Sequence, residues 1–293
     1  MYTGTGTGPA ARRRVLGKQL RALRGTRSAA EAAKQARISQ PTLSRIEGGR
    51  GALMPRNVAS LLAAYGVEGP QAEQLMSLAA SAEERGWWDA YSDVIAQSFE
   101  MYASLEADAA EIQTYEAEFV PGLMQTADVV RALRLASHPK STPEELDRSV
   151  ALRMERQRQL RAQVSAVVNE AVVCRPIGSE PVWKEQLDRL RAEAAAGRLR
   201  ILPFAAGAHP GMGGAFSMLR FDDTEEMDLV YAGTERGSMY FEKPADLLRY
   251  AEVFHRLHEL ALSPEESAER LATLAQQPRR GGCILGDERG ATR

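Results

Sequence analysis

Apolar residues recur at helical spacing through residues 12–80 of the chain. In the first segment Val15, Leu16 and Leu20 would lie on one face of a helix, and Gly25 ends the pattern, because glycine favours the position that follows a helix. The same spacing returns in several further short segments. The pattern therefore predicts an all-α N-terminal domain of about five helices.

Capping residues mark where these helices begin and end. Ser28 and Glu31 have the spacing of a capping box, so a second helix should begin there. Ser39 is a good N-cap for a third helix, and Pro41 is tolerated because the first helical turn has no intrahelical use for its amide. That helix should end at Gly48. The remaining two helices are expected over residues 55–65 and 69–80.

Beyond residue 86 a long, mostly helical region precedes the strand signals. The helical pattern continues through residue 116, and two more helices follow, one from Leu123 and one from Thr142 to about Leu160. Short β-branched or alternating runs then predict strands in SAVVNEAVV, RLRILPF, GAFSMLRF and MDLVYAG. The helical segment between the first two has the length of a crossover, the connection that parallel strands require.

Two helices, from Pro244 and after Pro264, close the pattern. Residues 86–276 are therefore expected to form a larger α+β domain with a small sheet and flanking helices. The inward side of the first closing helix is expected to carry Leu247, Leu248, Val253, Phe254, Leu257 and Leu260. The Gly- and Thr-rich residues 1–11 and the Arg- and Gly-rich residues 277–293 are typical of a disordered leader and tail.

Charge is distributed unevenly along a chain whose formal net charge is −2. Residues 1–56 contain twelve Lys or Arg and two acidic residues, so this part carries +10 and the remainder −12. This asymmetry favours a nucleic-acid contact confined to one end. No apolar run reaches the ~18 residues of a membrane helix, and the N-terminus lacks the apolar core of a signal peptide. We therefore expect a cytoplasmic, nucleoid-associated protein with no membrane partner.

The third predicted helix carries side chains suited to reading DNA. Glutamine can bond adenine bidentately, threonine offers a hydroxyl and a methyl group, and arginine binds guanine or phosphate. The outward residues of these types are Gln40, Thr42, Ser44 and Arg45. Basic residues around the helix would neutralise phosphates and set the register: Arg13, Lys18, Arg21, Arg27, Arg50 and Arg56. The alternative, a helix-turn-helix that serves only as a protein interface, is disfavoured by this basic surround.

Residues 12–66 resemble the helix-turn-helix of the XRE family, the group of the phage Cro and CI repressors. The resemblance is carried by S-x-x-E-x-A from Ser28, by ISQPTLSRIEGG, and by the Tyr65-Gly66 pair. It implies that the helix beginning near Ser39 is the recognition helix, that the helix from Ser28 lies across the DNA backbone, and that Glu47 is mainly structural. Both serines are therefore included among the expected DNA-contacting residues.

Three positions depart from the family's pattern. Ala29 stands where the family has glutamine, Ala32 where it has leucine, and Arg37 where it has the turn glycine. The resemblance implies that the first change removes a phosphate contact, and that the other two leave a thinner core or a strained turn.

The remaining chain carries a second resemblance. GWWDAYSD, RMERQRQL, VVNEAV and GAFSMLRF, among other segments in the same order, are similar to the C-terminal domain of WhiJ-type regulators. These regulators are common in actinobacteria and are described as antitoxin-like. The resemblance covers nearly all of residues 86–275. It implies a transcription regulator, often encoded beside a small partner protein, and it supplies no active site.

The sequence argues against catalysis and metal binding. One dense acidic run comprises Glu106, Asp108, Glu111, Glu116 and Glu118. Such runs usually form solvated helix faces, and no His, Cys or Lys partner stands at catalytic spacing. His255 and His258 lack nearby ligands and are typical of an ordinary helix surface, and no phosphate-binding, nucleophile-elbow or dinucleotide motif is present. We expect no enzyme activity, no cofactor and no metal.

Aromatic residues crowd the start of the larger domain. They are Trp87, Trp88, Tyr91, Phe99, Tyr102 and Tyr115. They would line a pocket for a small effector molecule or a partner, or they would cement the junction of the two domains. The Arg-rich helix with Arg148, Arg153, Arg156, Arg158 and Arg161 is expected to be a solvated or dimer-facing surface.

These features predict a sequence-specific DNA-binding transcription regulator. One helix-turn-helix reads a half-site, so a homodimer held by the larger domain would bind a pseudo-palindromic operator in double-stranded DNA. That domain would receive its signal from a small ligand or a small partner protein. The alternative is an antitoxin-like adaptor that sequesters a small co-encoded protein and autoregulates its own promoter.

Overall fold

The structure is a computed structural model that describes residues 8–49, 53–83, 87–95, 97–221, 228–234 and 237–276. It divides into two compact units. The first consists of Met1–Ile112, Arg158–Gln163 and Met218–Leu247. The second consists of Gln113–Gln157, Val164–Ser217 and Leu248–Arg293. The tail predicted to be disordered, residues 277–293, lies outside the described residues, and Cys283 lies there with it.

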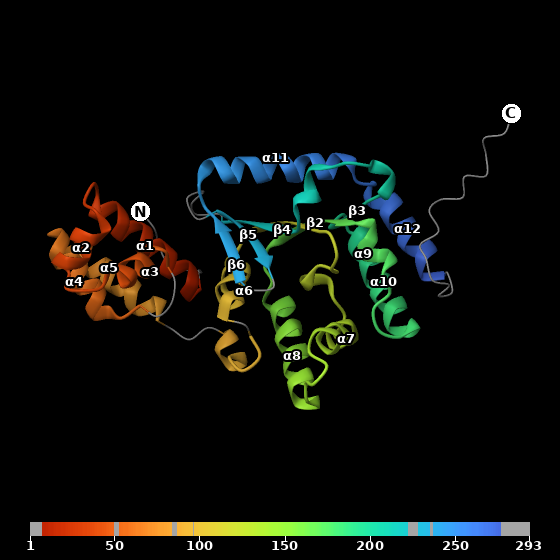
Figure 1. Cartoon of the computed structure of the whole chain (residues 1–293), viewed down its shortest axis with the longest axis horizontal. Helices are drawn as coiled ribbons and strands as arrows, with labels where there is room; N and C mark the ends of the chain where they lie inside the picture. Colours follow the sequence, from red (N-terminus) through yellow and green to blue (C-terminus); the bar gives the residue numbers. More distant parts are fainter. Residues whose placement is uncertain are drawn as a thin grey trace. The chain divides into compact units, whose positions relative to one another are not determined.

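Five helices form the N-terminal domain (Figure 1), which confirms its all-α class. They are α1 (Pro9–Arg24), α2 (Ala29–Gln35), α3 (Gln40–Glu47), α4 (Pro55–Tyr65) and α5 (Pro70–Ala82). Their apolar faces meet in one core, in which the most buried large side chains are Leu16, Leu20, Leu43, Leu53 and Leu61. The predicted caps and breaks place these helices correctly to within a few residues, because each boundary is fixed by a local interaction.

Helix α1 begins at Pro9, earlier than the domain start expected at residue 12. Proline is favourable at the first helical position, since its missing amide hydrogen is not needed there. The amide of Gly8, the N-cap residue, donates to the carboxylate of Asp108 at the end of α6 (Gln97–Asp108). Ala11 is fully buried. These contacts give the first turn of α1 partners that the sequence pattern alone did not reveal.

In the part of the chain that the structure describes, six strands form one mixed sheet in the order β3-β2-β1-β4-β5-β6. They are β1 (Glu111–Glu116), β2 (Gln163–Asn169), β3 (Leu199–Leu202), β4 (Phe216–Arg220), β5 (Leu229–Thr234) and β6 (Gly237–Phe241). Strands β2 and β3 are parallel, with Val168 opposite Ile201, and β5 and β6 are antiparallel. The crossover between β2 and β3 contains α10 (Glu180–Ala195), so the predicted α+β class and parallel pair are both confirmed.

The sequence pattern missed two strands and misread part of a third. Strand β1 lies within a region predicted to be helical, although its buried Ile112 and Thr114 alternate with half-buried residues as a strand requires. Strand β6 was not predicted. The second half of the predicted strand SAVVNEAVV is helix α9 (Glu170–Cys174), because the Asn169 side chain accepts a hydrogen bond from the Ala171 amide at 2.9 Å and caps a helix there.

Further helices accompany the sheet. They are α7 (Ala127–Ser137), α8 (Pro143–Gln159), α11 (Pro244–Leu260) and α12 (Pro264–Gln276), with short 3-10 turns η1 (Trp87–Tyr91), η2 (Gly122–Met124), η3 (Phe204–Ala206) and η4 (Pro210–Gly213). The outer edge of β3 is closed at Ile201, whose amide donates to the Ser267 hydroxyl at 3.0 Å and whose carbonyl accepts from the Leu262 amide at 2.8 Å. Closing a sheet edge in this way prevents its pairing with another chain.

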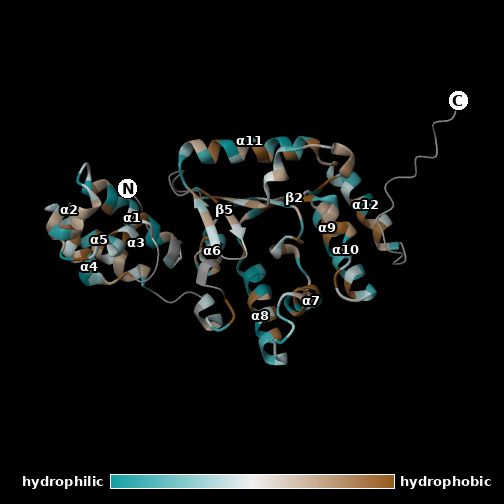
Figure 2. Ribbon diagram, viewed as in Figure 1, coloured by the Kyte–Doolittle hydropathy of each residue, from teal (hydrophilic) through white to brown (hydrophobic). Residues whose placement is uncertain are grey.

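Helix α11 is amphipathic, as predicted, and hydrophilic and hydrophobic residues alternate along its ribbon in Figure 2. Phe254 and Leu257 are buried. Leu248 is 64% exposed, so its predicted inward position is wrong. Leu248 lies beside exposed Arg249, whereas Leu247 in the same turn is partly buried, and an apolar residue at one exposed position costs little.

Candidate nucleic-acid interface

Capping interactions fix both ends of α2. The Ser28 hydroxyl accepts from the Glu31 amide at 3.2 Å, and the Glu31 carboxylate accepts from the Ser28 amide at 3.0 Å, which confirms the predicted capping box. At the other end the Ile38 amide donates to the Ala33 carbonyl at 3.0 Å, a bond that reverses the chain after the helix. The turn into α3 is therefore specified by the backbone of α2 itself.

Ser39 caps α3, as the sequence predicted. Its hydroxyl accepts from the Thr42 amide at 3.1 Å and also shares a hydrogen bond with the Thr42 hydroxyl at 2.7 Å. Two of the predicted DNA-contacting residues are thus bonded to each other at the start of the helix. This arrangement fixes the N-terminus of α3, the end that enters a major groove in helix-turn-helix proteins.

Helix α3 has one buried and one exposed face. Leu43 and Ile46 are buried in the core of the domain, whereas Gln40, Ser44 and Arg45 are exposed. The exposed residues recur at spacings that place them on one side of the helix. They offer an amide, a hydroxyl and a guanidinium, which are the groups that bond base edges and phosphates.

An ion pair that the sequence did not predict holds the C-terminal end of α3. The Arg24 guanidinium donates to both carboxylate oxygens of Glu47, at 2.6 and 3.1 Å. Both side chains are largely buried, with 14% and 9% of their surfaces exposed. The hydrogen bonds to Glu47 are the main reason why the pKa of Arg24 is raised. The bidentate pair ties the end of α1 to the end of α3, which is a structural role of the kind that the family resemblance implies for Glu47.

Arg27 is engaged within the domain. Its guanidinium lies 4.7 Å from the centre of the Tyr65 ring and donates to the carbonyls of Leu23, Arg24 and Ala64 at 3.0 to 3.2 Å. These carbonyls belong to the last turns of α1 and α4. In this position Arg27 satisfies the ends of two helices and stacks on an aromatic ring. No sequence signal distinguished it from the exposed arginines.

The other predicted contacts are more dispersed. Arg56 is exposed in the first turn of α4, and Arg21 is exposed on α1. The Arg13 guanidinium donates to the Ala82 carbonyl at 3.2 Å. Arg50 lies outside the described residues. The residues that the structure brings together on one helix face are therefore those of α3.

Comparison with known families gives two matches. Residues 15–75 match a model described as a helix-turn-helix domain. Residues 99–273, more than half of the chain, match a model described as a domain of unknown function, DUF5753. The chain belongs to the DUF5753 family. The helix-turn-helix match supports a DNA-binding regulator, and no curated protein and no solved structure matches the chain.

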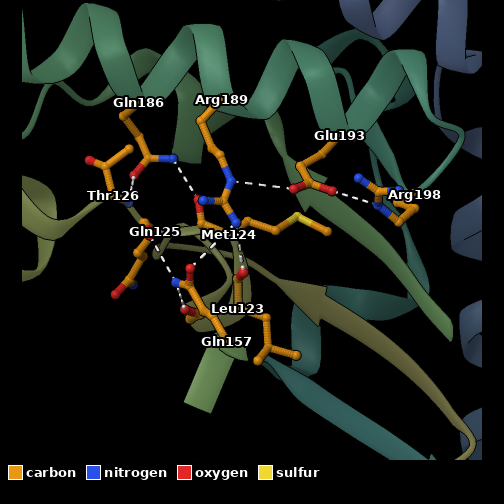
Figure 3. Close-up of polar contacts among 10 residues, drawn as sticks. Leu123, Met124, Gln125, Thr126, Gln157, Gln186, Arg189, Glu193 and Arg198 are labelled. Carbon is orange, nitrogen blue, oxygen red and sulfur yellow. Dashed lines mark hydrogen bonds and ion pairs between the residues drawn. The ribbon is translucent and has the colours of Figure 1, made fainter. Parts of the chain in front are cut away.

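Within the DUF5753 region, polar side chains hold the loop that follows β1 (Figure 3). Gln186 of α10 donates to the Met124 carbonyl and accepts from the Thr126 amide, both at 2.8 Å. Gln186 is fully buried, so its two polar atoms depend on these partners. The side chain acts as a clamp on the backbone of the loop.

A second pair of side chains completes this clamp. Gln157 of α8 donates to the carbonyls of Gly122 and Gln125 at 3.0 and 2.8 Å. Arg189 of α10 points toward the same loop in Figure 3 and donates to the Leu123 carbonyl at 3.4 Å. Helices α8 and α10 therefore bind successive backbone groups of one irregular segment, which would otherwise be buried without partners.

The sequence contained a signal for this clamp. Trp183, Leu187 and Leu190 recur at helical spacing and are buried, and Gln186 shares their face. A glutamine at a core-facing helix position indicates a buried hydrogen-bonding task. What it binds could not be inferred, because the loop lies far away in sequence.

Helix α8 is not a wholly solvated arginine surface. Arg156 is 5% exposed, and a Cβ atom added to Gly122 would lie 2.2 Å from Nη1 of Arg153. Both arginines therefore lie near Gly122 of the clamped loop, and the prediction of a solvated surface is wrong for Arg156. Glu116, at the end of β1, is also affected by Arg153: burial raises the pKa of its carboxyl to about 7, and the charge of Arg153 opposes that rise.

Only part of the acidic run is a solvated face, since Glu118 is exposed whereas Glu106 is buried. Glu106 is 2% exposed. Burial, the largest cause, raises the pKa of Asp108 to about 6, against the opposing effect of the hydrogen bond from the Gly8 amide. Glu111 lies 3.8 Å from the Arg220 guanidinium. These carboxylates are distributed between α6 and β1 and serve separate local contacts.

The predicted aromatic cluster is divided into smaller groups. Trp87 packs edge-on against Trp88 and Tyr91, with ring centroids 5.9 and 6.3 Å apart. Tyr102 packs against Tyr231 of β5 with centroids 4.2 Å apart. Trp88 and Tyr102 are both buried, which is typical of core packing.

Tyr115 belongs to a different group, in the second unit. Its ring lies 6.0 Å from that of His209 and 6.3 Å from that of Phe216. A Cβ atom on Gly211 would lie 2.7 Å from the Tyr115 ring, so the backbone of η4 rests directly on it. Tyr115 therefore packs with aromatic residues of the second unit, and the effector pocket stays a prediction.

In the described part of the chain, no helix has the length and apolar character needed to cross a membrane.

Proposed function

We propose that this protein is a sequence-specific transcription regulator that reads double-stranded DNA with α3. The observation that supports this most directly is the exposed face of Gln40, Ser44 and Arg45 on a capped helix within a matched helix-turn-helix domain. The concentration of positive charge in residues 1–56 adds to it, since DNA binding draws much of its free energy from phosphate neutralisation.

In this proposal the N-terminal end of α3 enters the major groove. Gln40, in the first turn, bonds a base edge, and Arg45 binds guanine or a phosphate. Ser44 and Thr42 add hydroxyl contacts, and Ser28 and Ser39 hold the ends of their helices against the backbone. The arginines proposed to contact phosphates are Arg50 and Arg56. Arg27, whose guanidinium is bonded within the domain, is proposed to support DNA binding by holding the ends of α1 and α4.

The proposal includes a homodimer. A single helix-turn-helix reads only a half-site, and two copies held ~34 Å apart match successive major grooves. A pseudo-palindromic operator follows from the two-fold symmetry of such a dimer. We assign dimerisation and the reception of a small ligand or small partner protein to the DUF5753 region. The protein would act in the cytoplasm, on the nucleoid, without enzyme activity.

A second candidate is an adaptor that sequesters a small co-encoded protein and autoregulates its promoter. The DUF5753 region exposes several large apolar side chains that favour a protein contact: Phe119, Leu135, Phe204, Met212 and Leu248. Co-expression with the product of an adjacent short reading frame tests this candidate. A stable complex by size-exclusion chromatography supports it, and two separate peaks at micromolar concentration contradict it.

Fluorescence anisotropy with DNA from the protein's own upstream region tests DNA reading. We expect tight binding that resists competition by a scrambled duplex and weakens as salt is raised. Arg45→Ala should lose ~1 to 3 kcal/mol of binding free energy on the cognate duplex. Arg249→Ala removes the same charge from α11, where Arg249 lies 3.4 Å from Glu252, and should leave the affinity within about twofold.

Two results would count against DNA reading. One is equal affinity for the native and scrambled duplexes at every salt concentration. The other is equal losses for the α3 variant and for Arg249→Ala, because a nonspecific electrostatic effect would not distinguish the recognition helix from α11.

A further inference from the structure

The turn between α2 and α3 contains an unusual backbone conformation. Arg37 has φ of 56°, in the left-handed region. Its amide donates to the Lys34 carbonyl at 3.2 Å, and the next residue, Ile38, donates to Ala33. These two bonds form a Schellman motif, in which the residue at the position of Arg37 is usually glycine. The predicted strained turn is therefore present.

Elsewhere in the described structure this conformation is taken by glycine. Within the N-terminal domain, helices α1 and α4 are each followed by a glycine with positive φ, Gly25 and Gly66, and the turn after α3 uses Gly49. A residue with a Cβ atom in this region is less stable than glycine, because its Cβ lies too close to the backbone. The turn after α2 is therefore less stable with Arg37 than it would be with glycine, which would form the same two hydrogen bonds.

Among the residues that the structure describes, the Arg37 side chain has no polar partner that would offset this strain. Arg37 is exposed, and its guanidinium makes no hydrogen bond or ion pair with any residue that the structure describes. One turn earlier Lys34 is also exposed and already supplies a positive charge to the last turn of α2. A contribution to the helix dipole is therefore a weak reason for the arginine.

The position of Arg37 indicates another use. It lies two residues before Ser39, the N-cap of α3, and so at the corner beside the end of the helix that we propose to enter the groove. Exposed Lys34 on α2 and exposed Arg45 on α3 flank this corner in the sequence. Apart from Glu31, which is bonded to Ser28, residues 28–46 contain no acidic side chain. The surroundings favour a polyanion.

We propose that Arg37 is a DNA phosphate contact, for which the protein keeps an unfavourable turn. This inference rests on the proposed function and adds to it a residue that positions α3 on the DNA backbone. A long guanidinium side chain projecting from the turn bonds a phosphate beside the groove that α3 occupies. The contact carries no base information, so it should act equally on all sequences.

Three substitutions in the full-length chain test the inference. Arg37→Gly and Arg37→Asn remove the charge and suit the left-handed conformation, whereas Arg37→Lys keeps the charge and the cost. Anisotropy titrations from 50 to 300 mM salt, with the native and scrambled duplexes, give the affinity and its salt dependence. Hydrogen–deuterium exchange of residues 29–47 reports the local stability of the helix-turn-helix without DNA.

We expect Arg37→Gly and Arg37→Asn to bind both duplexes about five-fold more weakly near 150 mM salt and to lower the salt slope by about 1. Arg37→Lys should keep the wild-type slope. Arg37→Gly should also exchange more slowly than the wild type, because its turn is relaxed. Faster exchange in Arg37→Gly would mean that the arginine stabilises α2, and it would overturn the inference.

The inference and the proposed function fail in different ways. If the wild type prefers its operator, but the glycine and asparagine variants keep its affinity and salt slope, Arg37 is not a phosphate contact and the DNA reader stands. A loss of slope in Arg37→Lys equal to that in Arg37→Gly also overturns the inference. If the wild type does not distinguish the two duplexes, the proposed function itself fails.

Discussion

Gly17 of α1 determines how closely two helices of the N-terminal domain approach. A Cβ atom at this position would lie 2.5 Å from the Ile46 carbonyl oxygen and 2.7 Å from that of Glu47. Both oxygens belong to the last turn of α3, and backbone atoms cannot move aside as a flexible side chain can. The absence of a side chain at Gly17 thus allows α1 and α3 to pack closely together.

Gly17→Ala is therefore expected to destabilise the domain. Alanine normally stabilises a helix by ~1 kcal/mol relative to glycine, but overpacking here should cost ~1 to 3 kcal/mol and weaken DNA binding as α3 is displaced. Hydrogen–deuterium exchange of α1 and α3 measures the loss. Gly213→Ala is the control, because its Cβ would meet no atom within 4 Å. Slower exchange in Gly17→Ala would contradict the close approach.

Glu116 gives the DUF5753 region a pH-dependent stability. Burial raises the pKa of its carboxyl from 4.5 to about 7 in the folded protein. Below 4.5 the group is protonated in both states. Between 4.5 and about 7 the unfolded chain loses its proton first, so the free energy of unfolding falls as pH rises and levels off above about 7.

Glu116→Gln should abolish the decrease in the free energy of unfolding between pH 4.5 and about 7. We expect the variant to gain ~1 to 3 kcal/mol over the wild type between pH 4.5 and pH 8, less whatever attraction to Arg153 is lost. Urea unfolding of both proteins at the two pH values measures the difference. Glu118→Gln, an exposed neighbour paired with Arg175, should show the wild-type dependence. If the free energies of unfolding of Glu116→Gln and the wild type changed in parallel with pH, Glu116 would not be the group responsible for the pH dependence.

At the scale of elements, the loop at residues 120–126 owes its conformation to side chains of α8 and α10. Replacing Gln186 by alanine leaves the Met124 carbonyl and the Thr126 amide without their partner. Each unsatisfied buried group costs ~1 to 3 kcal/mol. We therefore expect Gln186→Ala to lose ~2 to 5 kcal/mol of unfolding free energy, measured by urea titration, and to expose the loop to hydrogen exchange.

The matched control is Glu185→Ala, an exposed position of α10 beside Gln186. It should change the unfolding free energy by less than ~0.5 kcal/mol. Gln186→Glu is a second comparison, because a carboxylate still accepts from the Thr126 amide but cannot donate to the Met124 carbonyl. A loss in Gln186→Ala no larger than in Glu185→Ala would mean that the clamp does not hold the loop.

The elements also show what the sequence could predict. Helices with strong local signals, such as α2 with its capping box and α3 with Ser39 as N-cap, were placed correctly, since every group that defines their ends lies within a few residues. Strand β1 was mistaken for helix, because its six residues follow α6 and pair only with distant segments.

Burial of charge was the least predictable property of the candidate sites. Arg24 and Arg27 resemble their exposed neighbours in sequence, yet each is bonded within the helix-turn-helix domain. Arg156 and Glu106 are buried although charged runs usually face solvent. In each case the environment is set by residues distant in sequence, whereas the exposed face of α3 follows from helical periodicity alone.

At the scale of the whole molecule, net charge and the two family matches are divided along the chain. The helix-turn-helix match and the excess of positive over negative charge lie near the N-terminus, whereas the DUF5753 match covers residues 99–273 in the acidic remainder. An acidic remainder is poorly suited to a second DNA contact, since it repels phosphates. In the proposed homodimer, the sequence range on DNA would be extended by a second copy of the chain and not by a larger DNA-binding surface on one copy.

The spacing of half-sites tests this pairing. Once footprinting has defined the operator, inserting about five base pairs between its half-sites rotates one of them by about half of the ~10.5-base-pair turn. A dimer of fixed geometry can then occupy only one groove, so we expect the affinity to fall at least about tenfold. Substituting the central bases without changing the length is the control and should have a smaller effect.

Analytical ultracentrifugation of the complex should show two copies of the protein per duplex. A single copy bound at saturation, with an affinity that the insertion leaves unchanged, would mean that each helix-turn-helix reads DNA alone and that the DUF5753 region has a task other than dimerisation.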